Sequence, residues 1–210
     1  MSKNIRLEKI TPPSKDNITG LILAGGQGSR FHNQDKGLIK FKGITLVEFV
    51  ANRLKTQTST IAISANRNLD FYQQHHFHTI TDIIHGYSGP LAGIHAALKN
   101  LSSEWLVSIA CDTPCFPENY VQQLTQAIAN TQKRLAVVKS NNRLQNVSML
   151  VHKSLFNSLD VFLDAGERKA QLWLQQQSPC IVEINQPQQA FFNINTPEDL
   201  LTLEKLDCND

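Results

Sequence analysis

Residues 18–37, ITGLILAGGQGSRFHNQDKG, decide the fold of this chain. A short apolar run, Ile18 to Ala24, predicts a buried strand that ends abruptly in a glycine-rich loop. Glycines let successive backbone N–H groups turn toward one centre, and such nests bind phosphate oxygens. Arg30 and Lys36 follow closely and place positive charge beside the same anion. The stretch therefore predicts a nucleotide or phosphate site at the end of the first strand.

The type of glycine loop follows partly by exclusion. A P-loop is excluded because the chain contains no Gly-Lys pair. A dinucleotide-binding fingerprint requires G-x-G-x-x-G, whereas Gly26, Gly28 and Phe31 give G-x-G-x-x-F. An ordinary strand-to-helix turn that requires glycine stays open as the alternative to a phosphate-binding loop.

Length and composition favour one α/β domain. The chain has 210 residues, of which 41% are hydrophobic, so it can bury a sizeable core. A formal net charge of +2 is too small to indicate a nucleic-acid or membrane-surface partner, and no apolar stretch approaches the length of a membrane span. Residues 1–17 are polar, and we predict a flexible N-terminal leader followed by a single domain over residues 18–210.

The cysteines and the N-terminal residues bear on the cellular compartment. The first residues lack the apolar centre of a secretory signal, which predicts a cytoplasmic protein. No C-x-x-C pair is present, which argues against a zinc ribbon. In a reducing compartment we expect free thiols at all four cysteines, Cys111, Cys115, Cys180 and Cys208.

Hydrophobic periodicity predicts alternating strands and helices. The predicted strands are 18–24, 60–64, 77–81, 105–110, 135–138, 147–151, 180–184 and 190–192. The predicted helices cover 44–57, 90–101, 117–129, 154–164, a segment ending near 173, and 197–206. This alternation predicts a three-layer α/β/α fold with a mostly parallel, Rossmann-like central sheet.

Polar clusters end four successive predicted strands. The glycine loop ends the first, Ser64 and Asn66 the second, Asp82 the third and Asp112 the fourth. Since ligands bind at the carboxyl ends of parallel strands, these clusters predict a single site.

Each candidate side chain has a functional and a plain structural interpretation. Asp112 follows a buried strand and would bind Mg²⁺ beside phosphates, or it is a turn residue before Thr-Pro. Asp82 would contact a base, a ribose or the metal, or it is an exposed loop acid. Lys36 would neutralise charge as a phosphate leaves, or it is a surface lysine. The stretch HHFH (75–78) offers too few ligands at a useful spacing to favour a metal site.

Several motifs, taken in order, resemble those of the molybdenum cofactor guanylyltransferase family, whose members have a nucleotidyltransferase fold of the glycosyltransferase-A type. The resemblance covers about residues 18–206. The matching segments are 23–30 (LAGGQGSR), 35–38 (DKGL), 65–67 (ANR), 89–93 (GPLAG), 111–114 (CDTP), 165–168 (AGER) and 192–198 (FNINTPE).

The resemblance implies transfer of GMP from GTP to Mo-molybdopterin, with release of pyrophosphate. It implies Mg²⁺ as cofactor and molybdoenzymes or other cofactor-biosynthesis proteins as further partners. Family binding roles fall on Leu23, Ala24, Gly25, Lys36, Asp82 and Asp112, with Asp112 also on Mg²⁺. The amides of Gly25, Gly26 and Gly28, with Arg30 and Lys36, are then expected to hold the triphosphate. Asn193 and Asn195 are expected toward the pterin.

The sequence departs from the family pattern in three places. His32-Asn33 stand where the family often has Gly-Gly, Ser64 stands where it often has Asn, and Gln145-Asn146 replace a usual His-Pro pair. At the second of these, Asn66 or a water is expected to take part of the base contact. Two other functions stay open: a cytidylyltransferase of the same fold, and a non-catalytic protein that binds nucleotide and delivers cofactor.

Overall fold

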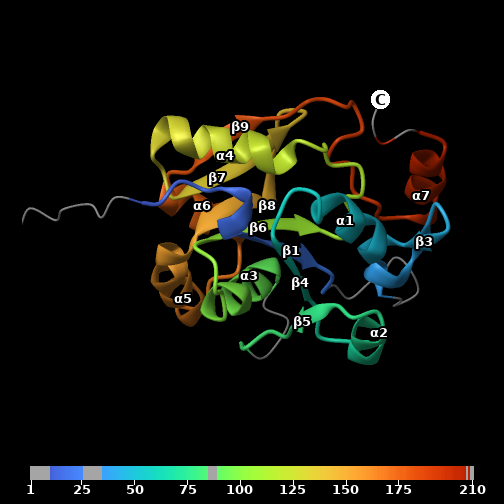
Figure 1. The fold of residues 1–210 in the computed structure, drawn as a ribbon, viewed down its shortest axis with the longest axis horizontal. Coiled ribbons are helices and arrows are strands. Elements are labelled where there is room, and N and C mark those ends of the chain that lie inside the picture. The colour runs from blue at the N-terminus through green and yellow to red at the C-terminus, as the bar shows by residue number, and fades with distance from the viewer. Residues whose placement is uncertain (1–9, 26–34, 85–88, 207, 209–210) are drawn as a thin grey trace, which may run out of the picture.

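A computed structural model describes residues 10–25, 35–84, 89–206 and 208 (Figure 1). The strands are β1 (Ile18–Leu23), β2 (Lys40–Phe41), β3 (Ile44–Thr45), β4 (Thr60–Ser64), β5 (His78–Ile80), β6 (Trp105–Ala110), β7 (Leu135–Ser140), β8 (Arg143–His152) and β9 (Cys180–Glu183). The α-helices are α1 (Leu46–Leu54), α2 (Leu69–Gln74), α3 (Pro90–Lys99), α4 (Tyr120–Thr131), α5 (Phe156–Asp164), α6 (Ala170–Gln177) and α7 (Pro197–Glu204). Short 3-10 turns cover Lys15–Asn17, Lys36–Leu38 and Lys153–Leu155.

The central sheet has seven strands in the order β5-β4-β1-β6-β8-β7-β9. The pairs β5–β4, β4–β1, β1–β6 and β7–β9 are parallel, and β8 runs antiparallel to both β6 and β7. The predicted mostly parallel sheet is therefore confirmed. The four strands that end in the predicted polar clusters are neighbours and point the same way.

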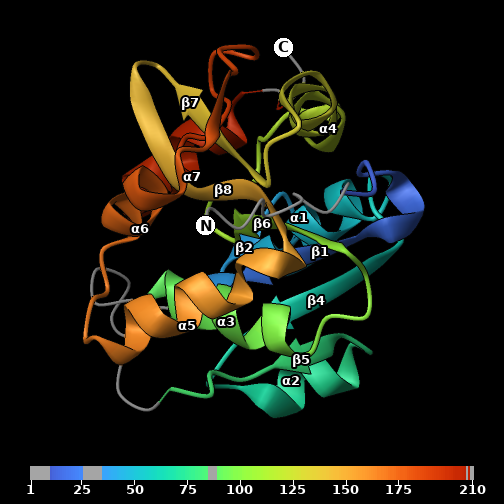
Figure 2. The same ribbon diagram turned by 90° about the vertical axis from the view of Figure 1, so that its left-hand side faces the viewer.

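Helices cover both faces of this sheet (Figures 1 and 2). Successive residues of a strand point to opposite faces, so Ile22 of β1 belongs to the core cluster that contains residues of α1 and α4, while Leu21 and Leu23 belong to the cluster that contains residues of α3, α5 and α6. Both faces of β1 and β6 are thus buried, as their continuous apolar runs predict. The predicted three-layer architecture is confirmed.

The first half of β8 extends beyond the carboxyl end of β6. Only residues 149–152 of β8 pair with β6, whereas its early residues pair back with β7, Leu144 with Lys139 and Arg143 with Ser140. The β7–β8 hairpin therefore projects past the edge of the sheet at which the parallel strands end.

A small third apolar cluster joins the β2–β3 hairpin to α7. It contains Phe41, Leu46, Ile194 and Leu203, together with a disulfide between Cys115 and Cys208. Our expectation of free thiols is wrong for these two cysteines and holds for Cys111 and Cys180. The bonded cysteines are 93 residues apart in sequence and 4.6 Å apart at their Cα atoms, so only the fold brings them together.

Two further differences from the sequence prediction concern local structure. Residues 190–192 form no strand, because Phe191 has a positive φ of 60° within a turn that buries its ring. β2 and α2 lie in segments where no element is expected from the sequence, and β3 takes the first two residues of the helix predicted over 44–57, which begins at Leu46 instead. β2, β3 and α2 are short, with two-residue strands and a six-residue helix, so hydrophobic periodicity has little chance to reveal them.

Residues 10–17 lie against the body of the domain. The Trp105 indole donates to the carbonyl of Thr11 at 3.0 Å, and the Lys15 ammonium donates to the carbonyl of Thr56 at 2.8 Å. Pro13 is buried and Ile10 packs against the core. Across the ranges that the structure describes, no helix is both long enough and apolar enough to span a membrane.

Candidate functional site

Backbone hydrogen bonds tie the four strand ends into one continuous edge. Ala24 N donates to Ser64 O at 2.9 Å, Ala65 N to Ile80 O at 3.1 Å, and Cys111 N to Leu23 O at 3.1 Å. These bonds continue the ladder past the last residue of each strand. The residues that follow the ends of β1, β4, β5 and β6, namely Gly25, Asn66, Asp82 and Asp112, consequently lie on one rim, where ligands bind in open α/β sheets.

Lys36 stands at the centre of one half of this rim. Its ammonium donates to Asp112 Oδ2 at 2.9 Å and to Asn195 Oδ1 at 2.9 Å. The Lys36 and Asp112 side chains are 20% and 17% exposed, so this ion pair is partly shielded yet open to a ligand. The structure therefore brings together Lys36 and Asp112, which lie 76 residues apart in the chain.

Asp35 holds the turn that carries Lys36. Its carboxylate is buried and accepts from Gly37 N at 3.0 Å, Asn68 Nδ2 at 3.0 Å and the Tyr72 hydroxyl at 3.4 Å. Burial, with the Asp35 charge nearby, raises the pKa of the Tyr72 phenol, so it stays a donor. No role is predicted for Asp35 from the sequence, although its place in the 35–38 (DKGL) motif, beside Lys36, is a signal for one.

Asn195 is fixed by the start of α7. Its backbone N–H donates to Asp199 Oδ2 at 2.9 Å, and that oxygen also accepts from Thr196 N at 2.8 Å in a capping box. Burial by itself would raise the pKa of Asp199, but the hydrogen bonds from Asn195 and Thr196 lower it overall. Ile194 N donates to Asp112 O at 2.8 Å, which joins this segment to the end of β6.

Asn193 lies on the same side through Thr113. The Thr113 hydroxyl donates to Asn193 Oδ1 at 3.0 Å and also lies 3.4 Å from Asp112 Oδ1. The segment 193–195, expected near the pterin, thus lies directly beside Asp112.

The other half of the rim is an Asn66–Asp82 pair. Asn66 Nδ2 donates to Asp82 Oδ2 at 2.8 Å, and Asp82 N donates to Asn66 Oδ1 at 2.9 Å. Burial raises the pKa of Asp82, and the hydrogen bond from Asn66 opposes that shift. Gly25 lies beside this pair, since a methyl group at Gly25 would be 3.8 Å from Asn66 Nδ2.

The two halves are too far apart to bind one metal ion. Asp82 follows β5 and Asp112 follows β6, with β4 and β1 between them. Three strand spacings amount to roughly 14 Å. Of the three contacts predicted for Asp82, this separation favours the base or the ribose over the metal.

Ser64 ends β4 but its side chain faces inward. It is 4% exposed and lies against Gly93 of α3, where an added methyl group would overlap the Ser64 hydroxyl. Its backbone carbonyl instead supports Ala24. Asn66 is exposed at the rim and is the side chain available to a ligand there.

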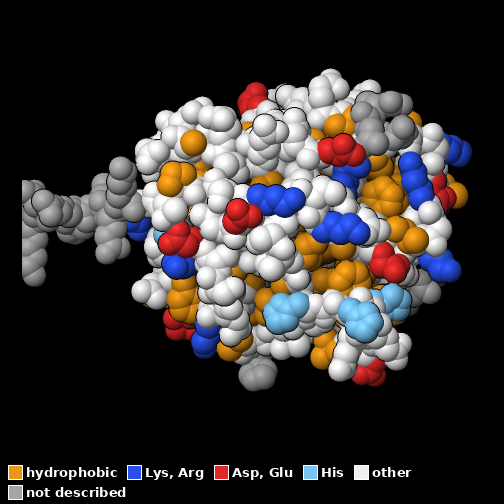
Figure 3. All heavy atoms as spheres, in the orientation of Figure 1, with side chains coloured by type: hydrophobic (Ala, Val, Ile, Leu, Met, Phe, Trp, Pro, Cys, Tyr) orange, Lys and Arg blue, Asp and Glu red, His pale blue; other side chains and the backbone are white. Residues whose placement is uncertain are grey.

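The described residues contain no group of three or more His, Cys, Asp and Glu side chains that could hold a metal ion. Histidines gather along the lower edge of the face in Figure 3, where α2 and β5 lie, but they form no such cluster. Mg²⁺ needs only one or two carboxylates plus phosphate oxygens, and Asp112, with amide oxygens of Asn193 and Asn195 close by, fits that requirement.

Gly26, Gly28 and Arg30 lie outside the described residues, as do His32 and Asn33. Their predicted part in holding a triphosphate stays a prediction. The described end of this loop, Leu23 to Gly25, reaches the rim between the two halves.

Comparisons with known proteins decide the family. A family model described as the MobA-like NTP transferase domain matches residues 20–180. A protein of Photobacterium profundum, named molybdenum cofactor guanylyltransferase, is 38% identical over 188 residues, which cover 90% of this chain and 96% of that protein. A protein of the same name from Serratia proteamaculans is 40% identical over 186 residues, covering 89% and 93% of the two chains. The chain belongs to the molybdenum cofactor guanylyltransferase family.

The family resemblance inferred from the motifs is thereby confirmed, and this guanylyltransferase-family chain is a nucleotidyltransferase. Solved structures agree on the fold. Molybdopterin-guanine dinucleotide biosynthesis protein A from Archaeoglobus fulgidus superposes with a TM-score of 0.75 at 22% identity, covering 89% of this chain and 97% of that one. 4-Diphosphocytidyl-2C-methyl-D-erythritol synthase from Anaerococcus prevotii gives 0.67 at 12% identity, covering 91% and 98%. At these identities the likeness concerns the fold alone.

Proposed function

We propose that the protein transfers GMP from GTP to Mo-molybdopterin and releases pyrophosphate, forming molybdopterin guanine dinucleotide in the cytoplasm. The observation that carries this proposal is the Lys36 ammonium held between Asp112 and Asn195 on the strand-end rim. The names of relatives at about 40% identity over nearly the whole chain support the choice of nucleotide and acceptor.

GTP fits the rim with its base on the Asn66–Asp82 side and its phosphates toward Gly25 and Lys36. Guanine presents N1–H and N2–H donors, which an ionised Asp82 carboxylate accepts. Asn66 orients Asp82 through two hydrogen bonds, one donated to its carboxylate and one accepted from its backbone N–H. The roughly 14 Å between Asp82 and Asp112 suits a nucleoside triphosphate laid along the rim.

Lys36 is arranged to bind a phosphate oxygen. An ammonium has three N–H donors, and Asp112 and Asn195 accept two of them. The third is left for the ligand, and the two fixed contacts orient it in advance. Mg²⁺ held by Asp112 would neutralise charge on phosphate oxygens, which is the chemistry a hard cation supplies to phosphoryl transfer.

The acceptor phosphate attacks the α-phosphorus of GTP in line with the bond to pyrophosphate, which breaks as the new P–O bond forms. Because a phosphate nucleophile is already anionic, the reaction needs no general base. Catalysis then consists of positioning and charge neutralisation, to which Lys36 contributes directly. Asn193 and Asn195 lie beside Asp112 and form the proposed acceptor side.

A direct assay tests this function. The full chain is incubated with GTP, Mg²⁺ and Mo-molybdopterin, and pyrophosphate release is followed together with the mass of the dinucleotide product. We expect both products with GTP, and neither when the acceptor is omitted. Pyrophosphate released with CTP in place of GTP would overturn the choice of nucleotide. Tight GTP binding by calorimetry without any release would overturn transfer and leave a nucleotide-binding protein.

A further inference from the structure

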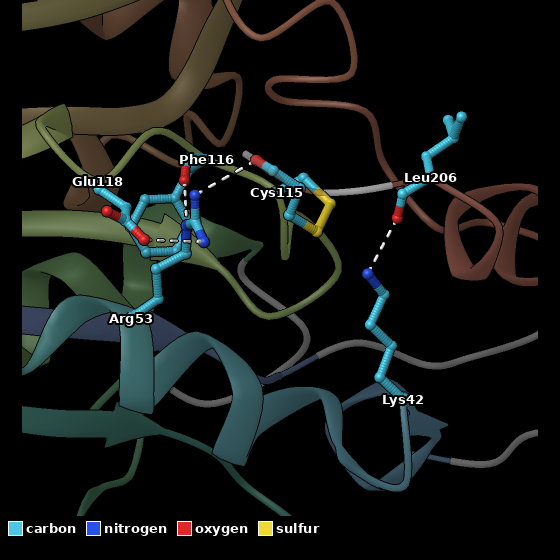
Figure 4. Close-up of a disulfide and its surroundings, with 7 residues drawn as sticks. Lys42, Arg53, Cys115, Phe116, Glu118 and Leu206 are labelled. Atoms are coloured by element: carbon cyan, nitrogen blue, oxygen red, sulfur yellow. Dashed lines mark hydrogen bonds and ion pairs between the residues drawn. A yellow bond between two sulfur atoms is a disulfide. The ribbon is translucent and has the colours of Figure 1, made fainter. Parts of the chain in front are cut away.

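A buried disulfide ties the α7 segment, residues 197–206 and 208, to the loop that leaves the candidate site (Figure 4). Cys115 and Cys208 are 0% and 2% exposed. Cys115 comes three residues after Asp112 in the chain. The bond therefore connects α7 covalently to the loop that holds the proposed metal-binding carboxylate.

Two cations fasten the same segment beside the bond. Lys42 Nζ donates to Leu206 O at 2.9 Å, and an Arg53 guanidinium nitrogen donates to Cys208 O at 3.3 Å (Figure 4). Arg53 also donates to Phe116 O, next to Cys115, so it bridges both sides of the disulfide. These contacts fix the end of the α7 segment against the body of the domain.

The start of the segment reaches Lys36. The capping oxygen of Asp199 holds Asn195 N at 2.9 Å, and Asn195 Oδ1 accepts from Lys36. Any shift of α7 relative to the Asp112 loop would therefore move one of the two groups that orient the Lys36 ammonium.

We propose that Cys115 and Cys208 form a dithiol–disulfide switch that positions Asn195, and through it Lys36. Cys115 and Cys208 are positioning residues in this scheme. The bonded form fixes Asn195 beside Lys36, and the dithiol form loosens it. The consequence for turnover rests on the proposed function, whereas the consequence for GTP binding does not.

The chemistry of the switch is a balanced exchange. Two thiols lose two electrons and two protons as the S–S bond forms, and a small disulfide such as glutathione disulfide accepts them and leaves as two thiols. A surface pocket of about 460 Å³, lined in part by Cys208, Glu118 and Pro187, lies beside the bond on the Cys208 side. Cys111 is 4% exposed and does not line this pocket.

The experiment compares the full chain equilibrated in oxidised and in reduced glutathione. Alkylation and peptide mass mapping report the Cys115–Cys208 bond, calorimetry gives Kd for GTP with Mg²⁺, and GMP transfer gives kcat/KM. We expect the reduced chain and Cys208→Ser to show a kcat/KM roughly threefold to tenfold below that of the oxidised chain, with weaker GTP binding. Cys208→Ser should no longer respond to glutathione, and Cys115→Ala should behave likewise.

Two controls separate positioning from stability. Cys180→Ser removes a free cysteine in β9, outside the site, and should respond to glutathione as the unmodified chain does. In Asn195→Ala, reduction should still lower the melting temperature but leave kcat/KM and Kd unchanged, because the link to Lys36 is already cut.

Equal Kd and kcat/KM in the oxidised and reduced chains would overturn the switch, as would absence of the bond in the oxidised chain. A redox-dependent Kd for GTP without any GMP transfer would uphold the switch and overturn the proposed function instead.

Discussion

At the scale of single residues, Lys36 is expected to carry much of the charge neutralisation. Replacement by Ala leaves Asp112 without its cation and the phosphates without a donor. Loss of one such preorganised donor typically costs about a hundredfold or more in turnover, and we expect that drop in kcat for Lys36→Ala. Steady-state pyrophosphate release measures it.

Lys40→Ala is the matched control for Lys36, because Lys40 is exposed in β2, only four residues away. Lys40→Ala should keep a kcat close to that of the unmodified chain. Near-unmodified turnover in Lys36→Ala as well would remove Lys36 from the mechanism.

The Asp82 carboxylate predicts a pH dependence of GTP binding. Burial raises the pKa of Asp82 above its ordinary value of 3.8, so the folded protein favours the protonated form more than an unfolded chain does. The contribution of this shift to the free energy of unfolding is therefore largest at low pH. It is lost as the pH rises through the pKa that Asp82 has in the folded protein. Guanine binding needs the ionised form, so the affinity should fall as pH drops through that raised value.

Calorimetric titrations of GTP at a series of pH values test this dependence. Asp82→Asn should bind GTP weakly at every pH and lose the slope, since an amide does not ionise. Asp70→Asn, an exposed acid in α2, should retain the slope of the unmodified chain. A slope that persists in Asp82→Asn would assign the titration to another group.

At the scale of elements, the close approach of α3 to the end of β4 depends on Gly93. A methyl group there would overlap the Ser64 hydroxyl and approach Leu23 at 3.1 Å. Gly93→Ala should therefore lower the free energy of unfolding by about 1 to 3 kcal/mol, as overpacking usually does. Urea denaturation measures this change.

A double-mutant cycle identifies the cause of that loss. Ser64→Ala removes the nearest overlapping atom, so Gly93→Ala should cost less in that background, with a coupling of about 0.5 kcal/mol or more. Additive effects of the two substitutions would show that the two residues do not meet in the folded protein.

Two strands of the central sheet were predictable to the residue, and β1 ends one residue before the predicted end at Ala24. β4 and β6 begin and end where the apolar pattern does, and the Thr-Pro start of α7 is confirmed by its capping box. The prediction of a strand over residues 190–192 was wrong because an apolar segment can be buried in a turn as well as in a strand. The sequence pattern reports burial, and only the fold decides which backbone bonds accompany it.

At the scale of the whole molecule, contacts between segments that are far apart in the sequence could not be predicted. Lys36 and Asn195 are 159 residues apart, and the disulfide joins cysteines 93 residues apart. Parallel strands end at the same edge of a sheet, and this rule predicted that Lys36 and Asp112 lie at one edge. No comparable rule brings the α7 segment to that edge, so the partner of Lys36 and the bonded cysteines could be learned only from the structure.

We expect residues 10–17 to contribute to the stability of the whole domain. They supply the acceptor of the fully buried Trp105 indole and cover the core with Ile10 and Pro13. Deleting residues 1–17 should lower the free energy of unfolding by about 1 to 3 kcal/mol, since a buried donor then loses its partner. Denaturation with urea, followed by tryptophan fluorescence, reports the loss.

Deletion of residues 1–9 alone is the control, because it retains every one of these contacts. Equal stability of the two truncated chains would show that residues 10–17 add nothing to the fold.

The reversed direction of β8 has a consequence for how such enzymes diversify. The β7–β8 hairpin extends beyond the end of β6, whereas the rim on which we propose that the nucleotide lies belongs to the parallel strands β5, β4, β1 and β6. Insertions between Ser140 and Arg143 would reshape that hairpin without disturbing the register of β1, β4 and β6. The hairpin can therefore change in length while the pairing of the parallel strands stays constant.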